Sequence, residues 1–181
     1  MKPRSYSSEG IVLARRNFGE ADRILVIFTK NTGRLSLIAK GVRRPKSRKR
    51  GHIEVFNQVA FQASSGKGID IMTEAEVIDD FSEIRKSLKK VSLAYYLAEV
   101  VGRITHDNEA NSELYDLILE TYEKLKTAKR LRILRLNFIS DLLTLTGFWP
   151  KGRPIPDPDT KLEEVIERQI ASERVGKRMI Q

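Results

Sequence analysis

Seven basic side chains stand close together in the first half of the chain, and no acidic residue interrupts them. They are Lys40, Arg43, Arg44, Lys46, Arg48, Lys49 and Arg50. Cations grouped in this way can neutralise several phosphates of a polyanion at once, and arginine adds bidentate phosphate contacts. We therefore predict that these seven residues bind nucleic acid. The alternative is a solvated charge run, or a targeting address, with no nucleic-acid ligand.

The overall charge favours the same kind of partner. The 181 residues include 33 Lys and Arg against 24 Asp and Glu, a net charge of +9. Residues 1–80 hold 15 of these cations and 9 of the acids, so the excess is concentrated there. A chain this basic suggests a polyanion, either nucleic acid or an anionic membrane. No apolar run reaches the roughly 18 residues of a membrane span, and the first residues lack an apolar signal core. We expect a cytoplasmic protein that does not bind membranes.

The residue inventory excludes several kinds of chemistry. There is no cysteine, which rules out disulfides, thiolate zinc sites, iron–sulfur clusters and cysteine nucleophiles. The two histidines, His52 and His106, are far apart in the sequence. No group of residues has the spacing of a catalytic site. We therefore expect no metal, no cofactor and no enzymatic activity.

Short strands must position the basic residues. Apolar segments at 11–14, 24–28, 35–39, 53–62 and 69–77 predict five strands with no helix between them. In the last segment the alternation places one set of residues on one face and Asp70, Glu74 and Glu76 on the other; the first set is Ile69, Ile71, Thr73, Ala75 and Val77. Five such strands indicate a small barrel of the OB type. An SH3-like barrel is the alternative, which periodicity does not separate. The basic run, broken by Gly41 and Pro45, is predicted to be a loop.

Aromatic side chains would add base stacking to such a surface. Phe18 lies in a predicted turn and is the best candidate for an exposed ring. Phe28, Phe56 and Phe61 are predicted to belong to the core.

The pattern becomes helical after about residue 81. The stripe of Leu88, Val91, Tyr95, Ala98 and Val101 predicts a first helix. Further helices are expected from residue 111 or 112, over 128–146, and from residue 159 or 160 to 179, with a proline-rich loop at 150–158. We predict an α+β protein, with an OB-fold nucleic-acid-binding domain at 1–80 and an all-α domain at 81–181.

Several short motifs occur in an order and spacing that resembles the RecO family, the bacterial recombination mediators of DNA repair. They are Gly10-Ile11-Val12-Leu13, Gly19-Glu20-Ala21-Asp22-Arg23, Phe28-Thr29-Lys30, Gly33-Arg34, Ala39-Lys40-Gly41-Val42-Arg43 and Lys46-Ser47, followed far downstream by Thr146-Gly147-Phe148-Trp149-Pro150. The resemblance covers most of the chain and is strongest over the first 50 residues.

The resemblance implies an OB fold followed by helices. It also implies binding of single- and double-stranded DNA, annealing of complementary strands, and partnership with RecR, with the acidic tail of single-stranded DNA-binding protein and, indirectly, with RecA. It adds Arg23 and Arg34 to the candidate DNA-binding residues and suggests a location beside the bacterial nucleoid. A basic adaptor that binds RNA or ribosomes through the same barrel remains the alternative.

One departure from the family concerns zinc. Many members carry a four-cysteine zinc module after the Gly-Phe-x-Pro segment, whereas this chain has the proline-rich stretch Lys151–Asp159 there. We therefore expect a member of the family without the zinc module.

The third predicted helix combines cations with surplus apolar residues at its start. Arg130 and Arg132 stand next to Ile133, which lies off the main apolar stripe. An acidic peptide with a hydrophobic end needs this pairing, so we expect Arg130 and Arg132 to clamp the tail of single-stranded DNA-binding protein. Packing against another helix is the alternative.

Overall fold

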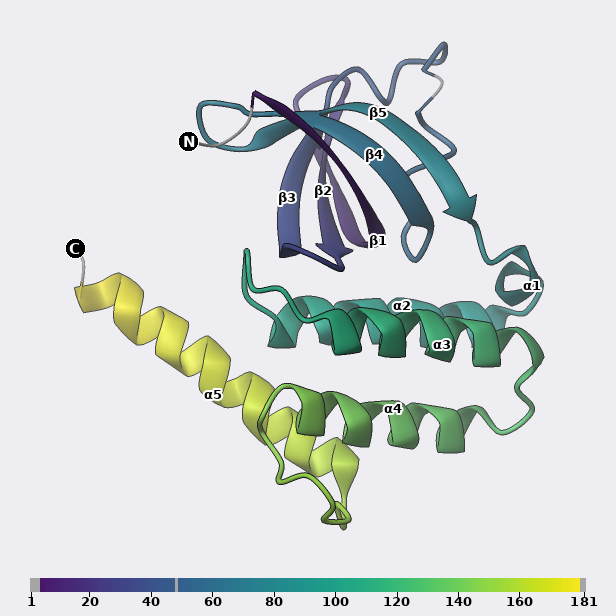
Figure 1. Cartoon of the computed structure of the whole chain (residues 1–181), viewed down its shortest axis with the longest axis vertical. Helices are drawn as coiled ribbons and strands as arrows, with labels where there is room; N and C mark the ends of the chain where they lie inside the picture. The colour runs from purple at the N-terminus through teal and green to yellow at the C-terminus, as the bar shows by residue number, and fades with distance from the viewer. Residues whose placement is uncertain (1–3, 48, 180–181) are drawn as a thin grey trace.

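The computed structural model describes residues 4–47 and 49–179, and the side chains as far as residue 168. Five strands come first: β1 (Ser5–Phe18), β2 (Asp22–Thr29), β3 (Gly33–Ala39), β4 (Gln58–Ser64) and β5 (Asp70–Asp79). Five helices follow: α1 (Ser82–Arg85), α2 (Leu88–Ile104), α3 (Ser112–Thr127), α4 (Leu131–Leu145) and α5 (Pro158–Met179). The predicted α+β class is confirmed (Figure 1).

The strands close into a barrel in the order β1-β2-β3-β5-β4. Neighbouring strands are antiparallel except β3 and β5, which pair in parallel. A closed five-stranded barrel with this crossover is the OB type, so strand pairing decides between the two barrels that periodicity left open.

Gly10 lies where β1 passes from one partner strand to the other. It pairs with Val59 of β4 on one side and with Thr29 of β2 on the other. A Cβ atom at this position would lie 2.4 Å from the Ile27 side chain and 2.9 Å from the Phe28 carbonyl oxygen. Only glycine lets β1 approach β2 this closely, and this approach closes the barrel.

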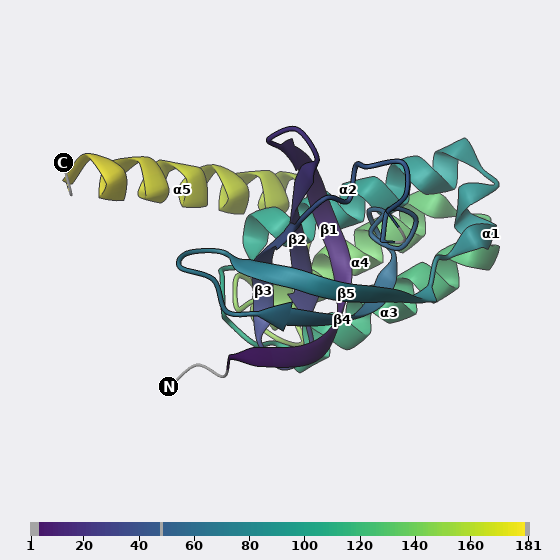
Figure 2. The ribbon, with the colours of Figure 1, turned by 90° about the horizontal axis from the view of Figure 1, so that it is seen from above.

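The apolar runs of β1 and β2 are buried on both faces. Val12, Leu25 and Ile27 point into the barrel, while Leu13 and Phe28 belong to a second core that continues into the helices. Seen from above, α2 and α3 lie under the barrel and α5 extends away from it (Figure 2). The barrel and the helices therefore share one hydrophobic core along the outer face of β1 and β2.

Helix α2 is more widely buried than its sequence stripe predicted. It packs against β1 and against α1, α3, α4 and α5. The residues that it buries are Leu93, Ala94, Leu97, Ala98, Val100, Val101 and Ile104. Leu88 and Tyr95, expected to face the core, are 82% and 42% exposed. A central helix buries two neighbouring faces, so a single stripe was the wrong description.

A bulge in β5 divides the alternation that the sequence predicted there: the part before the bulge is the reverse of the prediction, and Ala75 after it faces the barrel core as predicted. The pairing with β4 shifts between Gln62 and Ala63, which leaves Thr73 as the extra residue. Before the bulge, Asp70 and Met72 are buried, and after it Ala75 packs against the barrel core. Ile69 and Thr73 are consequently exposed rather than buried.

We predict that Gly33→Ala destabilises the protein by more than the left-handed backbone alone accounts for. Gly33 has φ +79, and a Cβ there would lie 1.9 Å from the Glu109 carbonyl oxygen, at the contact between barrel and helices. Gly19 has φ +58 but nothing within 4 Å of its Cβ position. Gly19→Ala should cost about 1–2 kcal/mol, and Gly33→Ala clearly more, in urea unfolding. Equal losses of stability in the two variants would show that the loop between α2 and α3, which contains Glu109, moves away from the new side chain at no energetic cost.

Candidate nucleic-acid interface

The basic run lies in the segment between β3 and β4, residues 40–57, which leaves the barrel at the upper right of Figure 1. Apolar anchors hold it at both ends, since Val42 and Ile53 are fully buried in the barrel core. The Asp22 carboxylate accepts a hydrogen bond from the Gly41 N–H at 2.7 Å, and the Arg43 N–H donates to the Ala21 carbonyl at 2.9 Å. The segment is therefore fixed to the turn between β1 and β2.

Anchoring the apolar residues inward leaves most of the cations outside. The exposed ones are Lys40, Arg43, Arg44, Lys46 and Arg50. Lys49 is half-buried instead, and its Nζ donates to the carbonyl oxygens of Met72 and Thr73 at 3.3 and 3.1 Å. Lys49 thus ties the segment to β5, while the five exposed cations face solvent. Arg48 lies outside the described residues.

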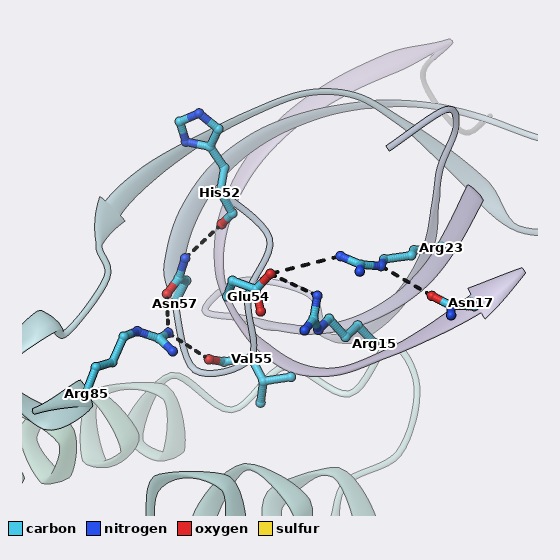
Figure 3. Close-up of polar contacts among 8 residues, drawn as sticks. All are labelled: Arg15, Asn17, Arg23, His52, Glu54, Val55, Asn57 and Arg85. Atoms are coloured by element: carbon cyan, nitrogen blue, oxygen red, sulfur yellow. Dashed lines mark hydrogen bonds and ion pairs between the residues drawn. The ribbon is translucent and has the colours of Figure 1, made fainter. Parts of the chain in front are cut away.

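Arg23 of β2 lies beside this segment together with Arg15 of β1, while Arg16 lies on the opposite face of β1; sequence reasoning missed both of these β1 arginines (Figure 3 shows Arg23 and Arg15). The β1–β2 pairing sets Asn17 opposite Arg23 and Arg16 opposite Ile24. Arg15 donates to Glu54 at 2.9 Å, and Arg16 is exposed. A hairpin around the turn at 19–21 brings residues on its two sides together. The Arg15-Arg16 pair before that turn was the signal that could have revealed them.

Most of the charged side chains that act on Arg23 are positive. Burial is the main cause that lowers the pKa of its guanidinium, and the nearby Arg15, Arg50 and Arg43 lower the pKa further, whereas Glu54 raises it. Cations drawn from β1, β2 and the 40–57 segment therefore act on one another. An anion placed among them would relieve this repulsion.

An exposed aromatic ring stands at the edge of the same region. Phe18, the last residue of β1, is 49% exposed, and the Arg43 guanidinium reaches back to the carbonyl of the adjacent Gly19 at 3.2 Å. Phe28, Phe56 and Phe61 are buried. The predictions of one exposed ring and three core rings are both confirmed.

Arg34 lies apart from the other candidates. It stands at the start of β3, and Lys40 follows the other end of that strand, about 20 Å away at the usual rise per residue. Its Nε donates to Asp107 at 2.6 Å and its Nη1 donates to the Gly102 carbonyl. Arg34 thus joins the barrel to the end of α2, and the structure does not bring it to the basic segment.

The second candidate pair lies at the start of α4. Arg130 is the N-cap residue, Arg132 follows in the first turn, and both side chains are exposed. Ile133 beside them is 48% exposed. Arg135 is occupied, because its guanidinium contacts both carboxylate oxygens of Asp159 at 2.5 and 2.8 Å.

The described part of the chain offers less evidence for a metal site, for a nucleic-acid site in another groove, or for a membrane-spanning helix. There, no group of three or more His, Asp or Glu side chains is placed to hold a metal ion. A groove of about 1170 Å³ lies along β1, β4 and β5 and mixes Lys30 and Lys49 with Glu9, Glu74 and Glu76. Its mixed charge suits a polyanion less well than the arginine-rich surface does. Within the same described residues, no helix is long and apolar enough to cross a membrane.

Comparison with known proteins agrees with this architecture. Residues 1–81 match the family described as Recombination protein O N terminal, and residues 85–152 match Recombination protein O C terminal. The DNA repair protein RecO of Dehalococcoides mccartyi strain ATCC BAA-2266 is 32% identical over 161 residues, which cover 89% of this chain and 64% of that protein. The DNA repair protein RecO of Desulforudis audaxviator is 34% identical over 148 residues, covering 82% and 59%.

A third relative is the DNA repair protein RecO of Roseiflexus sp., 31% identical over 151 residues, which cover 83% of this chain and 53% of that protein. The chain thus spans about half to two thirds of the length of these relatives. The two family matches follow one another along the chain, and the barrel followed by helices agrees with the architecture that the resemblance implied. The chain therefore belongs to the RecO family.

Proposed function

We propose that this chain is a DNA-binding recombination mediator of DNA repair that acts without catalytic turnover. The observation that carries the proposal is the group of exposed cations, Lys40, Arg43, Arg44, Lys46 and Arg50, gathered beside the β1–β2 turn of an OB barrel. Membership of the RecO family, and the name DNA repair protein carried by the relatives, support the same function.

We further propose a division of work between residues 1–80 and residues 81–181. The barrel binds single- and double-stranded DNA through phosphates, with Arg23 and the basic segment, including Arg48, as the contacts. Phosphate contacts leave base edges free, which suits the annealing of complementary strands. The helical part receives protein partners, namely RecR and the tail of single-stranded DNA-binding protein, and so assists the loading of RecA.

The first test reverses two exposed charges, Arg43→Glu together with Arg44→Glu. We expect weaker DNA binding, and a slope of log affinity against log salt that is smaller by about one to two, because each charge meets about one phosphate. Fluorescence anisotropy with labelled oligonucleotides measures both quantities. The fold should hold, since neither side chain is buried.

The matched control is Lys151→Glu together with Arg153→Glu. These two exposed cations lie in the loop after α4, and the control changes net charge by the same amount. We expect a much smaller loss of affinity. If both double variants lose affinity equally, net charge and not the basic segment governs binding.

Phe18 supplies a test that separates single strands from duplexes. Base stacking on an aromatic ring contributes about 1–3 kcal/mol per base, whereas stacked duplex bases offer it no free face. Phe18→Ala should therefore weaken binding of single-stranded DNA and leave duplex binding nearly unchanged. Equal losses on single strands and duplexes would remove Phe18 from the stacking role.

A competition experiment tests the alternative of an RNA- or ribosome-binding adaptor. Single-stranded RNA is added to the protein–DNA complex, and the alternative requires that RNA displaces DNA and that the protein does not anneal complementary strands.

The start of α4 supports the proposed partner contact. No acidic residue lies in its first turn, and a helix N-terminus favours an anion. Exposed Ile133 offers an apolar contact beside Arg130 and Arg132.

The double variant Arg130→Ala with Arg132→Ala should weaken binding of the acidic tail peptide at least severalfold in fluorescence anisotropy. The control variant, Lys151→Ala with Arg153→Ala, lies beyond the other end of α4 and should not weaken it. Unchanged binding in the first variant would place the peptide elsewhere.

A further inference from the structure

Glu54 is the one acidic residue in the sequence between β3 and β4, and its carboxylate lies between two arginines of the barrel. Its Oε1 is 2.9 Å from Nη1 of Arg15 and 4.0 Å from Nη1 of Arg23. Figure 3 shows the two guanidinium groups converging on this carboxylate from β1 and β2. Glu54 therefore lies inside the cation cluster to which its own segment contributes.

Arg23 has a donor that this arrangement does not satisfy. Its Nη1 is buried and has no hydrogen-bond partner among the described residues, because Glu54 is too far for a hydrogen bond. Its Nε reaches Asn17 only at 3.5 Å. Arg15 donates a hydrogen bond from its Nη1 to Glu54. One carboxylate oxygen thus lies near two guanidinium groups and accepts a hydrogen bond from only one of them.

We propose that Arg15 and Arg23 form a phosphate subsite of the DNA-binding surface, which Glu54 occupies in the free protein as a competing carboxylate. This inference rests on the proposed function. Carboxylate and phosphate are alternative bidentate partners for arginine. The two non-bridging oxygens of a backbone phosphate can each meet one of the two guanidinium groups, whereas Glu54 hydrogen-bonds only Arg15, so the phosphate displaces Glu54 and satisfies the unpaired Nη1 of Arg23.

The exposure of these groups allows the exchange. The side chains of Arg15 and Glu54 are 29% and 31% exposed and that of Arg23 is 15% exposed, so Glu54 can turn into solvent while an incoming phosphate takes its place beside the less exposed Arg23. An ion pair exposed to this degree is weak and easily replaced. Asp22, the other carboxylate close to the segment, is different, because it accepts the Gly41 N–H at 2.7 Å and belongs to the loop anchor. The competing role therefore falls to Glu54 alone of these two acids.

The test compares Glu54→Gln with Glu20→Gln in anisotropy titrations of a labelled single-stranded oligonucleotide. Glu20 is exposed in the β1–β2 turn, so both variants add one unit of positive charge near the same surface. We expect Glu54→Gln to tighten binding severalfold more than Glu20→Gln. Its salt slope should steepen by about one to two, because one or two further phosphate contacts form.

Glu54→Asp keeps the inference falsifiable if Glu54→Gln alters the fold, and Arg15→Gln adds a test of the coupling between Arg15 and Glu54. Glu54→Asp leaves net charge unchanged but draws the carboxylate away from Arg15, and it should also tighten binding. Arg15→Gln should cost less affinity in the parent, where it also removes the ion pair that phosphate must break, than in the Glu54→Gln background, where no such ion pair exists. Thermal unfolding of each variant identifies any loss of structure.

The outcomes separate this inference from the proposed function. Equal tightening by Glu54→Gln and Glu20→Gln, or weaker binding by Glu54→Gln in a folded protein, overturns the competing role of Glu54 and leaves DNA binding intact. If the parent shows no salt-dependent binding at all, the proposed function fails and this inference fails with it.

Discussion

The strands β1 and β2 are apolar on both faces, and this constraint decides how the molecule is assembled. The inner face fills the barrel with Leu25 and Ile27, and the outer face presents Leu13 and Phe28. That outer face must be covered, because exposed apolar area of this size is unfavourable in water. Helix α2 covers it and also packs against the four other helices. Barrel and helices are consequently one structural unit that shares a core.

The contact between the barrel and the helices also fixes the segment that carries the cations. At its far end, Phe56 is buried with φ +60, and its ring contacts Tyr95, Tyr122 and the Arg85 guanidinium. Arg85 of α1 also donates to the Val55 carbonyl at 3.1 Å and to Asn57 Oδ1 at 2.7 Å (Figure 3). One end of the segment is thus fixed by the barrel and the other by the helices, with the exposed cations between them. The residues that fix the far end of the segment thus come from helices that are distant from it in the sequence.

Charge on this surface is partly offset by a local carboxylate, although the whole chain carries a net charge of +9. The cluster combines arginines from β1, β2 and the 40–57 segment, and Glu54 offsets part of their repulsion. Two predicted DNA-binding residues instead serve the fold. Arg34, apart from the cluster, contacts Asp107 and Gly102, and Lys49, within the basic segment, contacts backbone carbonyls of β5. Sequence alone treats all these cations alike, because their partners come from other elements of the chain.

The sequence by itself determined the local features of this protein. Hydrophobic period located the five strands and the long helices, and the run of cations without an acid marked the candidate surface, since both depend on neighbours along the chain. Only the tertiary structure decided the features that depend on contacts between residues far apart in the sequence. The bulge at Thr73 reversed which residues are buried in the first part of β5, and the central position of α2 widened its buried face. Strand pairing chose the OB barrel and brought Arg15 and Glu54 to Arg23, because these contacts join residues far apart in the sequence and no local pattern encodes them.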